Sequence, residues 1–229
     1  MASCKVRRYE DSDYETVRNI FTAGMTELQP SVFVNFLKQP TCLLGLMSAF
    51  CILLLSSKSF LLPVLGVTLL VALLRYWTVG ASNRYITDSL NSDLMDIQRS
   101  YMKSENSCFW VAELDGCCVG MVACHPDRET VEYLELGRMS VLAAYRRKGI
   151  AKVLCRTVID FARQSGYNTV VLKTSEVQVA AHRLYESVGF KKVKETSFPL
   201  PSSFVDSLLK FKIYRYRYDI PTVVDDRYK

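Results

Sequence analysis

The spacing of apolar residues predicts a strand and a helix near the start of the chain and a second helix farther on. The stretch CKVRRYEDSDYETVRNIF (residues 4–21) fits a short strand, a turn and a helix, because four apolar residues in it recur at helical spacing: Tyr14, Val17, Ile20 and Phe21. Apolar residues return at helical spacing between Ile86 and Tyr101. We therefore expect a first helix that ends near Met25 and another helix at 86–101.

From residue 108 onward, strand patterns and helix patterns alternate. Residues 108–125 predict two strands joined at Asp115 and Gly116, a pair that favours a type I′ hairpin turn. The later elements are a strand at 131–141, a helix at 150–164, a strand at 168–175, a helix at 177–189, and strands at 190–195 and 211–220. This order predicts an α/β domain whose mixed sheet has helices on both faces.

Residues 42–74 are almost entirely apolar, and this run of about 33 residues interrupts the domain. The run is longer than the ~20 residues of one membrane span and shorter than two spans with a turn. Residues 56–59 (SSKS) break it near the middle, which leaves two halves of about 14 residues. We therefore predict a re-entrant or shallow membrane hairpin, with a buried hairpin in a soluble core as the alternative.

The insertion sets the expected domain limits and the topology. We assign 1–40 to the first strand and helices of the domain, 41–80 to the hairpin, 81–220 to the main part of the domain and 221–229 to a C-terminal tail. Both parts of the domain must lie on one side of the membrane if they build one sheet. Lys38, Arg75 and Arg84 flank the apolar run, which places both of its ends in the cytosol. We expect the endoplasmic reticulum membrane, with the domain facing the cytosol and the lipid bilayer as a partner.

The composition of the chain limits the classes of ligand that it is expected to bind. The chain has 29 Lys and Arg against 23 Asp and Glu, a net charge of +6, which suits anionic ligands or a membrane surface. It lacks the dense Lys/Arg clusters of nucleic-acid-binding faces, so we expect no nucleic-acid partner. The eight cysteines show no C-x-x-C spacing, so we interpret them as small apolar residues and predict no metal site.

The stretch YRRKGIAK (145–152) places three cations between a predicted strand and a predicted helix. The N-terminus of a helix presents free N–H groups and partial positive charge, which bind phosphate. Gly149 would let a pyrophosphate approach the backbone closely. A solvated surface turn is the alternative.

The pattern R-x-x-G-x-A, formed by Arg146, Gly149 and Ala151, resembles the acetyl-CoA motif of GCN5-related N-acetyltransferases. The later stretch VQVAAHRLYESVGF (177–190) resembles a helix of the same superfamily. Together with SCFWVAELDG and RMSV, these motifs resemble the camello-like N-acetyltransferase 8 family over essentially the whole chain, nearest to its aspartate-acetylating members. The resemblance implies a mixed, mostly antiparallel sheet flanked by helices and interrupted by a membrane hairpin.

The resemblance also implies a site. Tyr185 would protonate the departing thiolate, and Glu135 would be the general base. The alternative bases are Glu132 and Glu176. Glu135 could instead be an ordinary exposed carboxylate on a strand, without a catalytic role. Gln178 stands where the superfamily often has an asparagine that contacts the cofactor. The implied cofactor-binding residues are Met139, Ser140, Val141, Arg146, Arg147, Lys148, Gly149, Ile150, Ala151, Lys152, Gln178 and Tyr185.

Two further residues of the same strand carry expectations. Gly137 could mark a β-bulge that frees backbone N–H groups for the thioester oxygen. Arg138 would either bind a substrate carboxylate or form a structural ion pair.

We expect direct attack of an amine on acetyl-CoA, which serves as co-substrate without a metal. The expected acceptor is a small amino acid, aspartate first. A cysteine S-conjugate or a protein lysine is the alternative acceptor, and a catalytically silent acyl-CoA-binding membrane protein is the alternative outside the enzymes. The sequence does not indicate an oligomeric state.

Overall fold

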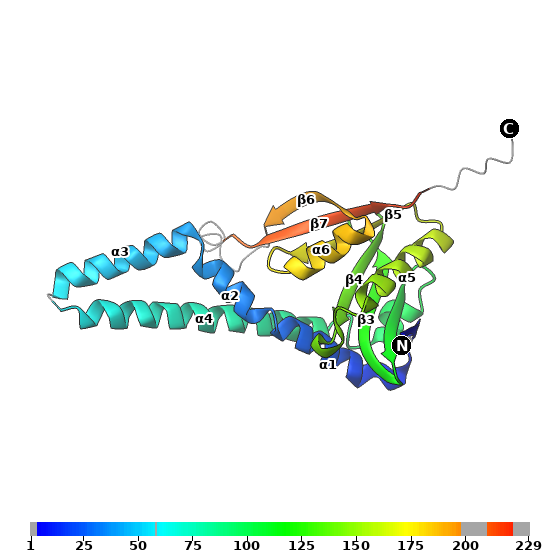
Figure 1. The fold of residues 1–229 in the computed structure, drawn as a ribbon, viewed down its shortest axis with the longest axis horizontal. Helices are drawn as coiled ribbons and strands as arrows, with labels where there is room; N and C mark the ends of the chain where they lie inside the picture. Colours follow the sequence, from blue (N-terminus) through cyan, green and yellow to red (C-terminus); the bar gives the residue numbers. More distant parts are fainter. Residues whose placement is uncertain (1–3, 58, 198–209, 222–229) are drawn as a thin grey trace.

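A seven-stranded sheet forms the centre of the molecule, which we describe from a computed structural model covering residues 4–57, 59–197 and 210–221 (Figure 1). Its strands are β1 (Lys5–Arg8), β2 (Cys108–Leu114), β3 (Cys117–Pro126), β4 (Leu134–Val141), β5 (Thr169–Ser175), β6 (Lys191–Ser197) and β7 (Lys212–Asp219). Their spatial order is β1-β2-β3-β4-β5-β7-β6. Only β4 and β5 pair in parallel among these described strands, so the expected mixed, mostly antiparallel sheet is confirmed.

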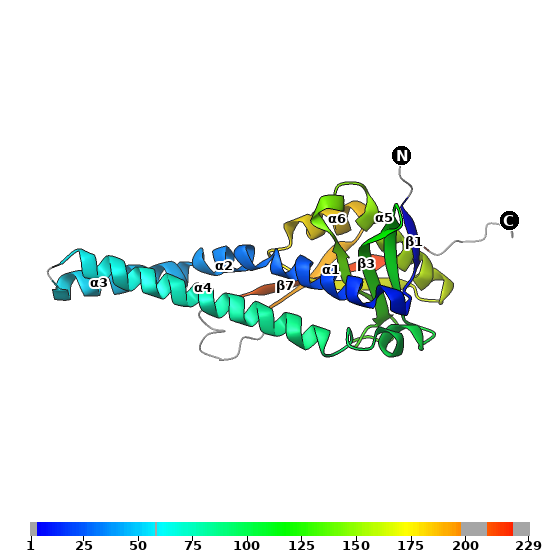
Figure 2. The same ribbon diagram turned by 90° about the horizontal axis from the view of Figure 1, so that it is seen from below.

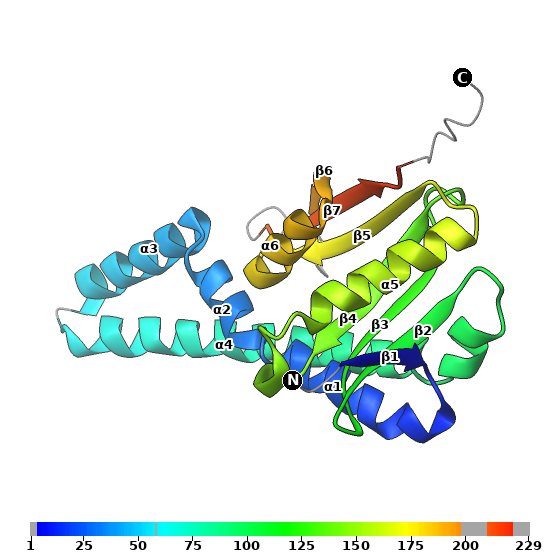
Figure 3. The same cartoon turned by 45° about the vertical axis from the view of Figure 1, so that its right-hand side comes forward.

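Helices cover both faces of this sheet. The α-helices are α1 (Tyr14–Thr26), α2 (Gln29–Leu37), α3 (Pro40–Ser57), α4 (Leu61–Leu90), α5 (Ile150–Gln164) and α6 (Val179–Val188). Shorter helical turns are η1 (Asp11–Asp13), η2 (Gln98–Met102) and η3 (Ala143–Tyr145). Helix α5 runs along one face, as Figure 3 shows, and α1 lies on the other.

Alternation along β2 explains the two-sided core. Trp110 packs on the face with Leu154 of α5, whereas Phe109 and Val111 pack on the opposite face with Ile20 of α1. Successive side chains of a strand point to opposite faces, so a strand buried on both sides becomes continuously apolar.

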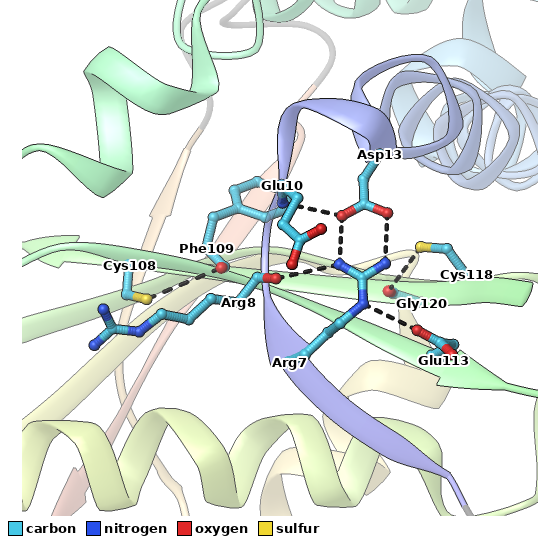
Figure 4. Close-up of polar contacts among 9 residues, drawn as sticks. All are labelled: Arg7, Arg8, Glu10, Asp13, Cys108, Phe109, Glu113, Cys118 and Gly120. Carbon is cyan, nitrogen blue, oxygen red and sulfur yellow. Dashed lines mark hydrogen bonds and ion pairs between the residues drawn. The ribbon is translucent and has the colours of Figure 1, made fainter. Parts of the chain in front are cut away.

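Arg7 fastens the first strand and helix to the sheet. Its guanidinium binds both carboxylate oxygens of Asp13, with Nη1–Oδ2 at 2.6 Å and Nη2–Oδ1 at 2.7 Å, and its Nε lies 2.9 Å from Oε2 of Glu113 (Figure 4). Because Asp13 immediately precedes α1 and Glu113 lies on β2, this one side chain connects three elements.

The apolar insertion is a helical hairpin. Helices α3 and α4 lie side by side and project away from the sheet (Figures 1 and 2). The two helices are longer than the apolar half-runs of about 14 residues, since α3 has 18 residues and α4 has 30. Helix α4 continues past the apolar run into the domain, where Ile86 and Ser89 are buried. Both helices are long and apolar enough to cross a membrane, by length and composition alone.

The helix predicted at 86–101 is wrong as a single element. Helix α4 ends at Leu90, a turn follows, and residues 98–102 form a short π-helical segment. Leu94 and Ile97 are still fully buried against α1 and the sheet, so the apolar spacing identified core positions correctly. The turn at 91–95 brings Asp93 to the edge of the cavity described next.

Candidate active site

A cavity of about 820 Å³ opens where β4 parts from β5. The two parallel strands pair only from Leu134 to Leu136 of β4, whereas β5 pairs with β7 along its whole length. The rest of β4 therefore has a strand partner only on its β3 side. The widening gap gives a linear molecule access to the backbone of β4.

A β-bulge in β4 lies in this gap. Met121 pairs with Ser140 and Ala123 with Gly137, so that Arg138 and Met139 together oppose one residue of β3. Arg138 has φ +53°, a left-handed conformation that costs a non-glycine residue about 1 kcal/mol or more. The sequence placed the bulge at Gly137, and the structure places it one residue later.

Glu135 enters the cavity from β4, next to the start of the bulge. Its side chain is 16% exposed, and its Oε2 lies 3.5 Å from Nζ of Lys173 on β5. Burial raises the pKa of Glu135, the nearby Lys173 cation lowers it, and the neighbouring carboxylate of Asp127 raises it, with a net upward shift. A carboxylate with a raised pKa is a better proton acceptor near neutral pH.

The two alternative carboxylates are placed elsewhere. Glu132 is exposed on the connection before β4, away from the residues that line the cavity. Glu176 accepts hydrogen bonds from the Asn35 side chain at 2.9 Å and the backbone N–H of Lys212 at 3.0 Å, which ties it to α2 and β7.

Arg138 lines the cavity with its guanidinium already engaged. Asp93 accepts hydrogen bonds from its Nε at 2.9 Å and its Nη2 at 2.5 Å, and Ser89 accepts one from Nη1 at 3.2 Å. The guanidinium carbon lies 5.0 Å from the centre of the Phe21 ring. Of the two roles predicted for Arg138, the structure contains the ion pair.

Tyr185 reaches the same cavity from α6. The residue is 6% exposed and packs against Phe190 and Tyr216, with ring centres at 5.9 and 6.1 Å. Burial raises its pKa, so the phenol is protonated at neutral pH. Its hydroxyl has no hydrogen-bond partner within the described part of the chain and can donate to a ligand.

Gln178 precedes the first residue of α6 and also lines the cavity. Its Oε1 accepts hydrogen bonds from the hydroxyls of Thr174 and Ser175 at 2.9 and 3.1 Å and from the Ser175 backbone N–H at 3.1 Å. This amide therefore shapes the turn between β5 and α6, a structural role that the sequence motif did not indicate.

The cationic turn lies beyond the cavity, at the end of β4. Gly149 has φ +81°, which favours glycine, and it immediately precedes the first turn of α5, Ile150 to Lys152. Arg146, Arg147 and Lys148 are all exposed, and Arg146 also donates to the Val141 carbonyl at 2.9 Å and to Glu27 at 2.6 Å.

The residues predicted to hold the cofactor are therefore divided. Met139, Gln178 and Tyr185 line the cavity, the cationic turn flanks α5, and Ser140 and Val141 join the two regions along β4. The Ser140 hydroxyl donates to the Ile20 carbonyl at 3.4 Å, and Val141 is buried. The free side of β4 runs from the helix N-terminus to the cavity, which fits an elongated ligand with a phosphate group at one end.

Sequence reasoning missed one whole wall of the cavity. Phe21 of α1, Phe36 of α2, and Trp77 and Tyr85 of α4 give this wall an aromatic surface. It also missed Lys173, although a lone cation within the otherwise apolar stretch VVLK was a usable signal. No signal in the sequence connects Asp93 to Arg138.

Comparison with known proteins identifies relatives for this arrangement. The sequence profile of the Acetyltransferase (GNAT) family matches residues 73–190. The chain is 41% identical to the "Probable N-acetyltransferase camello" of Xenopus tropicalis, over 96% of this chain and 99% of that one. It is 40% identical to the N-acetylaspartate synthetase of Danio rerio, over 93% of this chain and 76% of that one. A GNAT-family acetyltransferase of Staphylococcus aureus Mu50 shares the fold at a TM-score of 0.56 and 16% identity, over 96% of this chain and 100% of that one.

Proposed function

The chain belongs to the acetyltransferase (GNAT) family, in its camello-like group, and is an acetyl-CoA-dependent N-acetyltransferase; on this basis we propose that it acetylates the primary amine of a small amino acid, aspartate first. The identity to the N-acetylaspartate synthetase of Danio rerio supports aspartate. The cations that line the cavity also support an acceptor with a carboxylate, because guanidinium and ammonium groups bind carboxylates; these cations are Arg128, Arg138 and Lys173.

One observation carries the proposal: Glu135 of β4 and Tyr185 of α6 line the same cavity. Acetyl transfer to an amine needs a proton acceptor for the amine and a proton donor for the leaving thiolate. A buried carboxylate with a raised pKa suits the first task, and a protonated phenol suits the second.

Glu135 accepts the proton of the attacking amine, directly or through a water molecule. An α-amine titrates near about 8 and a lysine amine near about 10.4, so the acceptor is largely protonated at neutral pH and has to lose a proton first. As the C–S bond breaks, the hydroxyl of Tyr185 donates its proton to the sulfur of CoA.

The cofactor is held along β4 in this proposal. Backbone N–H groups at the start of α5 bind the pyrophosphate, and the exposed cations Arg147 and Lys148 add positive charge beside it. The free side of β4 near Met139 pairs with the pantetheine amides. The backbone of the bulge near Arg138 faces the thioester oxygen.

A second acceptor class is favoured by the aromatic wall. Phe21 and Phe36 offer no hydrogen-bond donor to a carboxylate, and with the ring of Trp77 they suit an apolar group attached to an amino acid. An S-substituted cysteine carries both an α-amine and such a group.

A panel of acceptors distinguishes these candidates. Release of CoA thiol is measured with L-aspartate, S-benzyl-L-cysteine and a lysine peptide, using wild-type protein and the Glu135→Gln variant, with Glu132→Gln as the control. We expect the highest kcat/KM with aspartate and a loss of about 10²- to 10⁴-fold in Glu135→Gln. Wild-type turnover in Glu135→Gln would remove Glu135 as the base. A higher kcat/KM with S-benzyl-L-cysteine would replace aspartate with the second class.

We also infer that the hairpin of α3 and α4 anchors the enzyme in the endoplasmic reticulum membrane with the domain in the cytosol. Support comes from the exposure of its apolar side chains, such as Leu55 at 83% and Phe60 at 68%. Each terminus is tagged and exposed to protease in sealed microsomes. Digestion of both tags is expected, because the elements on either side of the hairpin form one sheet and must lie on the same side of the membrane, which the proposal identifies as the cytosol. Protection of a single tag would show an odd number of crossings and contradict the hairpin.

A further inference from the structure

Asp127 lies directly behind Glu135 and has one unpaired oxygen. It follows the last residue of β3, and its backbone N–H donates to the Tyr133 carbonyl at 2.8 Å. His125 pairs with Glu135 across the two strands, so Asp127 is the diagonal neighbour of Glu135 on the same face of the sheet. The side chain of Asp127 is 0% exposed.

Two donors fix the orientation of the Asp127 carboxylate. Its Oδ2 accepts hydrogen bonds from Nη2 of Arg215 at 2.6 Å and from the backbone N–H of Thr130 at 2.9 Å. Its Oδ1 is buried and has no donor within the described part of the chain. A buried carboxylate oxygen without a donor costs about 1–3 kcal/mol, so a proton from a neighbour is the natural way to satisfy it.

Glu135 is the neighbour that can supply this proton. The register of β3 and β4 places the two carboxyl groups next to each other on one face of the sheet, so either group can donate a hydrogen bond to the other when it carries a proton. The contact lowers the pKa of Asp127, where burial acts in the opposite direction, and helps burial to raise the pKa of Glu135. Arg215 favours the charged form of Asp127, so the proton resides on Glu135.

We propose that Asp127 is a positioning residue for Glu135: its Oδ1 accepts a hydrogen bond from the carboxyl group of Glu135 after that group has taken the proton of the acceptor amine. The inference rests on the proposed role of Glu135 as the base. In this step the N–H bond of the amine breaks, an O–H bond forms on Glu135, and the new O–H group donates to Asp127. Asp127 touches neither the substrate nor CoA and acts only through Glu135.

Charged groups reach Glu135 from three strands. His125 lies on β3 and Asp127 directly follows that strand, Lys173 lies on β5 at 3.5 Å, and Arg215 of β7 acts through Asp127. Glu129 binds the same two cations, with Nζ of Lys173 at 3.2 Å from its Oε1 and with a short contact to Arg215. Glu129 is half exposed and does not contact Glu135, which makes it a matched control.

The test is the pH dependence of kcat in Asp127→Asn, with the better of L-aspartate and S-benzyl-L-cysteine as the acceptor. Because Arg215 and Thr130 require an oxygen at the Oδ2 position, the new Nδ2 group occupies the Oδ1 position and donates to Glu135. This donor favours the charged form of Glu135. We expect the acidic limb of the profile to move to lower pH by on the order of one unit, with a lower plateau. Titration of the acceptor amine is common to all variants and cancels in the comparison.

The controls separate this inference from the proposed function. Glu129→Gln is expected to keep the acidic limb at its wild-type position, and an equal shift in Glu129→Gln would assign the effect to the shared cations and overturn the proposal. An unchanged limb in Asp127→Asn, with Glu135→Gln inactive, would overturn the role of Asp127 and leave Glu135 as the base. Full activity of Glu135→Gln would contradict the proposed function itself.

Folding of the variant is checked independently. If Asp127→Asn does not fold, Asp127→Ser replaces it, with the same expected direction because a serine carries no negative charge. Infrared spectroscopy of the wild-type protein gives a second readout. We expect a carbonyl stretch of a protonated carboxyl group that appears as pH falls through the acidic limb, appears at lower pH in Asp127→Asn and is missing in Glu135→Gln; the same midpoint in Asp127→Asn and wild type would overturn the proposal.

Discussion

Arg138 and Asp93 form a two-point ion pair on the wall of the cavity although 45 residues separate them in the chain. Burial alone raises the pKa of Asp93, but the hydrogen bonds from Arg138 and Tyr101 lower it below its usual range. The carboxylate therefore stays charged and holds the bulged residue of β4 in place. An anionic acceptor that bound Arg138, as proposed, would compete with Asp93 for its guanidinium.

This competition predicts opposite effects of two substitutions. Asp93→Asn weakens the hold on Arg138 and is expected to lower the KM for aspartate, whereas Arg138→Gln is expected to raise it. Each variant is expected to lose about 1–3 kcal/mol of stability, because a partly buried charged group loses its partner. The measurements are KM for aspartate and the thermal midpoint. A rise in KM of similar size in both variants would show that the pair is purely structural.

Loss of the Tyr185 hydroxyl is expected to affect turnover far more than cofactor affinity. Tyr185→Phe keeps the buried ring and removes the donor, so we expect kcat to fall about 10²- to 10⁴-fold while acetyl-CoA affinity stays near the wild-type value. Tyr216→Phe is the control, because its ring packs beside Tyr185 and its hydroxyl donates to Glu186 at 3.1 Å. Rates are compared under single turnover, where equal rates in Tyr185→Phe and wild type would exclude the hydroxyl from the chemistry.

A charge placed at Gly149 is expected to weaken acetyl-CoA binding. Asp and Asn have the same size and tolerate a positive φ better than other side chains, so Gly149→Asp and Gly149→Asn differ mainly in charge. We expect Gly149→Asp to bind acetyl-CoA about 10-fold more weakly than Gly149→Asn, since it brings a carboxylate to the pyrophosphate. Calorimetry at low salt measures both, and equal affinities would place the phosphates elsewhere.

Acid is expected to remove the stabilisation that Asp13 provides. Burial alone raises the pKa of Asp13, but the hydrogen bonds from Arg7 and from the backbone of Glu10 lower it, and the net shift is downward. A lowered folded-state pKa means that the stabilisation is present above about pH 4 and is lost as pH falls through the folded-state value.

Asp13→Asn tests this linkage. The variant is expected to be about 1–3 kcal/mol less stable than wild type at pH 7, and the difference is expected to shrink below about pH 4. Asp160→Asn is the control, because its pair with Arg163 is exposed on α5 and such pairs contribute little. The thermal midpoint of the full chain is followed against pH. A difference that stays constant down to acid pH would contradict the linkage.

Local signals in the sequence predicted most of the elements. The hairpin at Asp115 and Gly116 has φ +52° and +79°, as a type I′ turn requires, and the helix predicted at 150–164 matches α5. Such features depend on a few neighbouring residues, so the sequence carries them directly. The bulge is an intermediate case, because Gly137 marks its position to within one residue while Arg138 adopts the positive φ.

Features that depend on distant residues could not be predicted. The break after Leu90 leaves the apolar spacing intact, and the turn is held by distant residues: Arg18 donates to the carbonyls of Leu90 and Leu94, and Arg138 binds Asp93. The position of Asp127 next to Glu135 on one face of the sheet follows from the register of β3 and β4, which the sequence does not specify. The aromatic wall is likewise built by three helices whose contact arises only in the folded chain.

Helix α4 runs unbroken from the apolar hairpin to the wall of the cavity, so a membrane around the hairpin would lie next to the cavity. At 1.5 Å per residue, the 16 steps from Leu61 to Trp77 span about 24 Å, less than the ~30 Å of a bilayer's hydrocarbon core. With the hairpin in the bilayer as proposed, the aromatic side of the cavity begins at the level of the lipid headgroups. An amphipathic acceptor would then be drawn from molecules adsorbed on the membrane, and its apparent KM would vary with the amount of lipid in the assay. Aspartate would reach the same cavity from bulk water, with a KM independent of lipid.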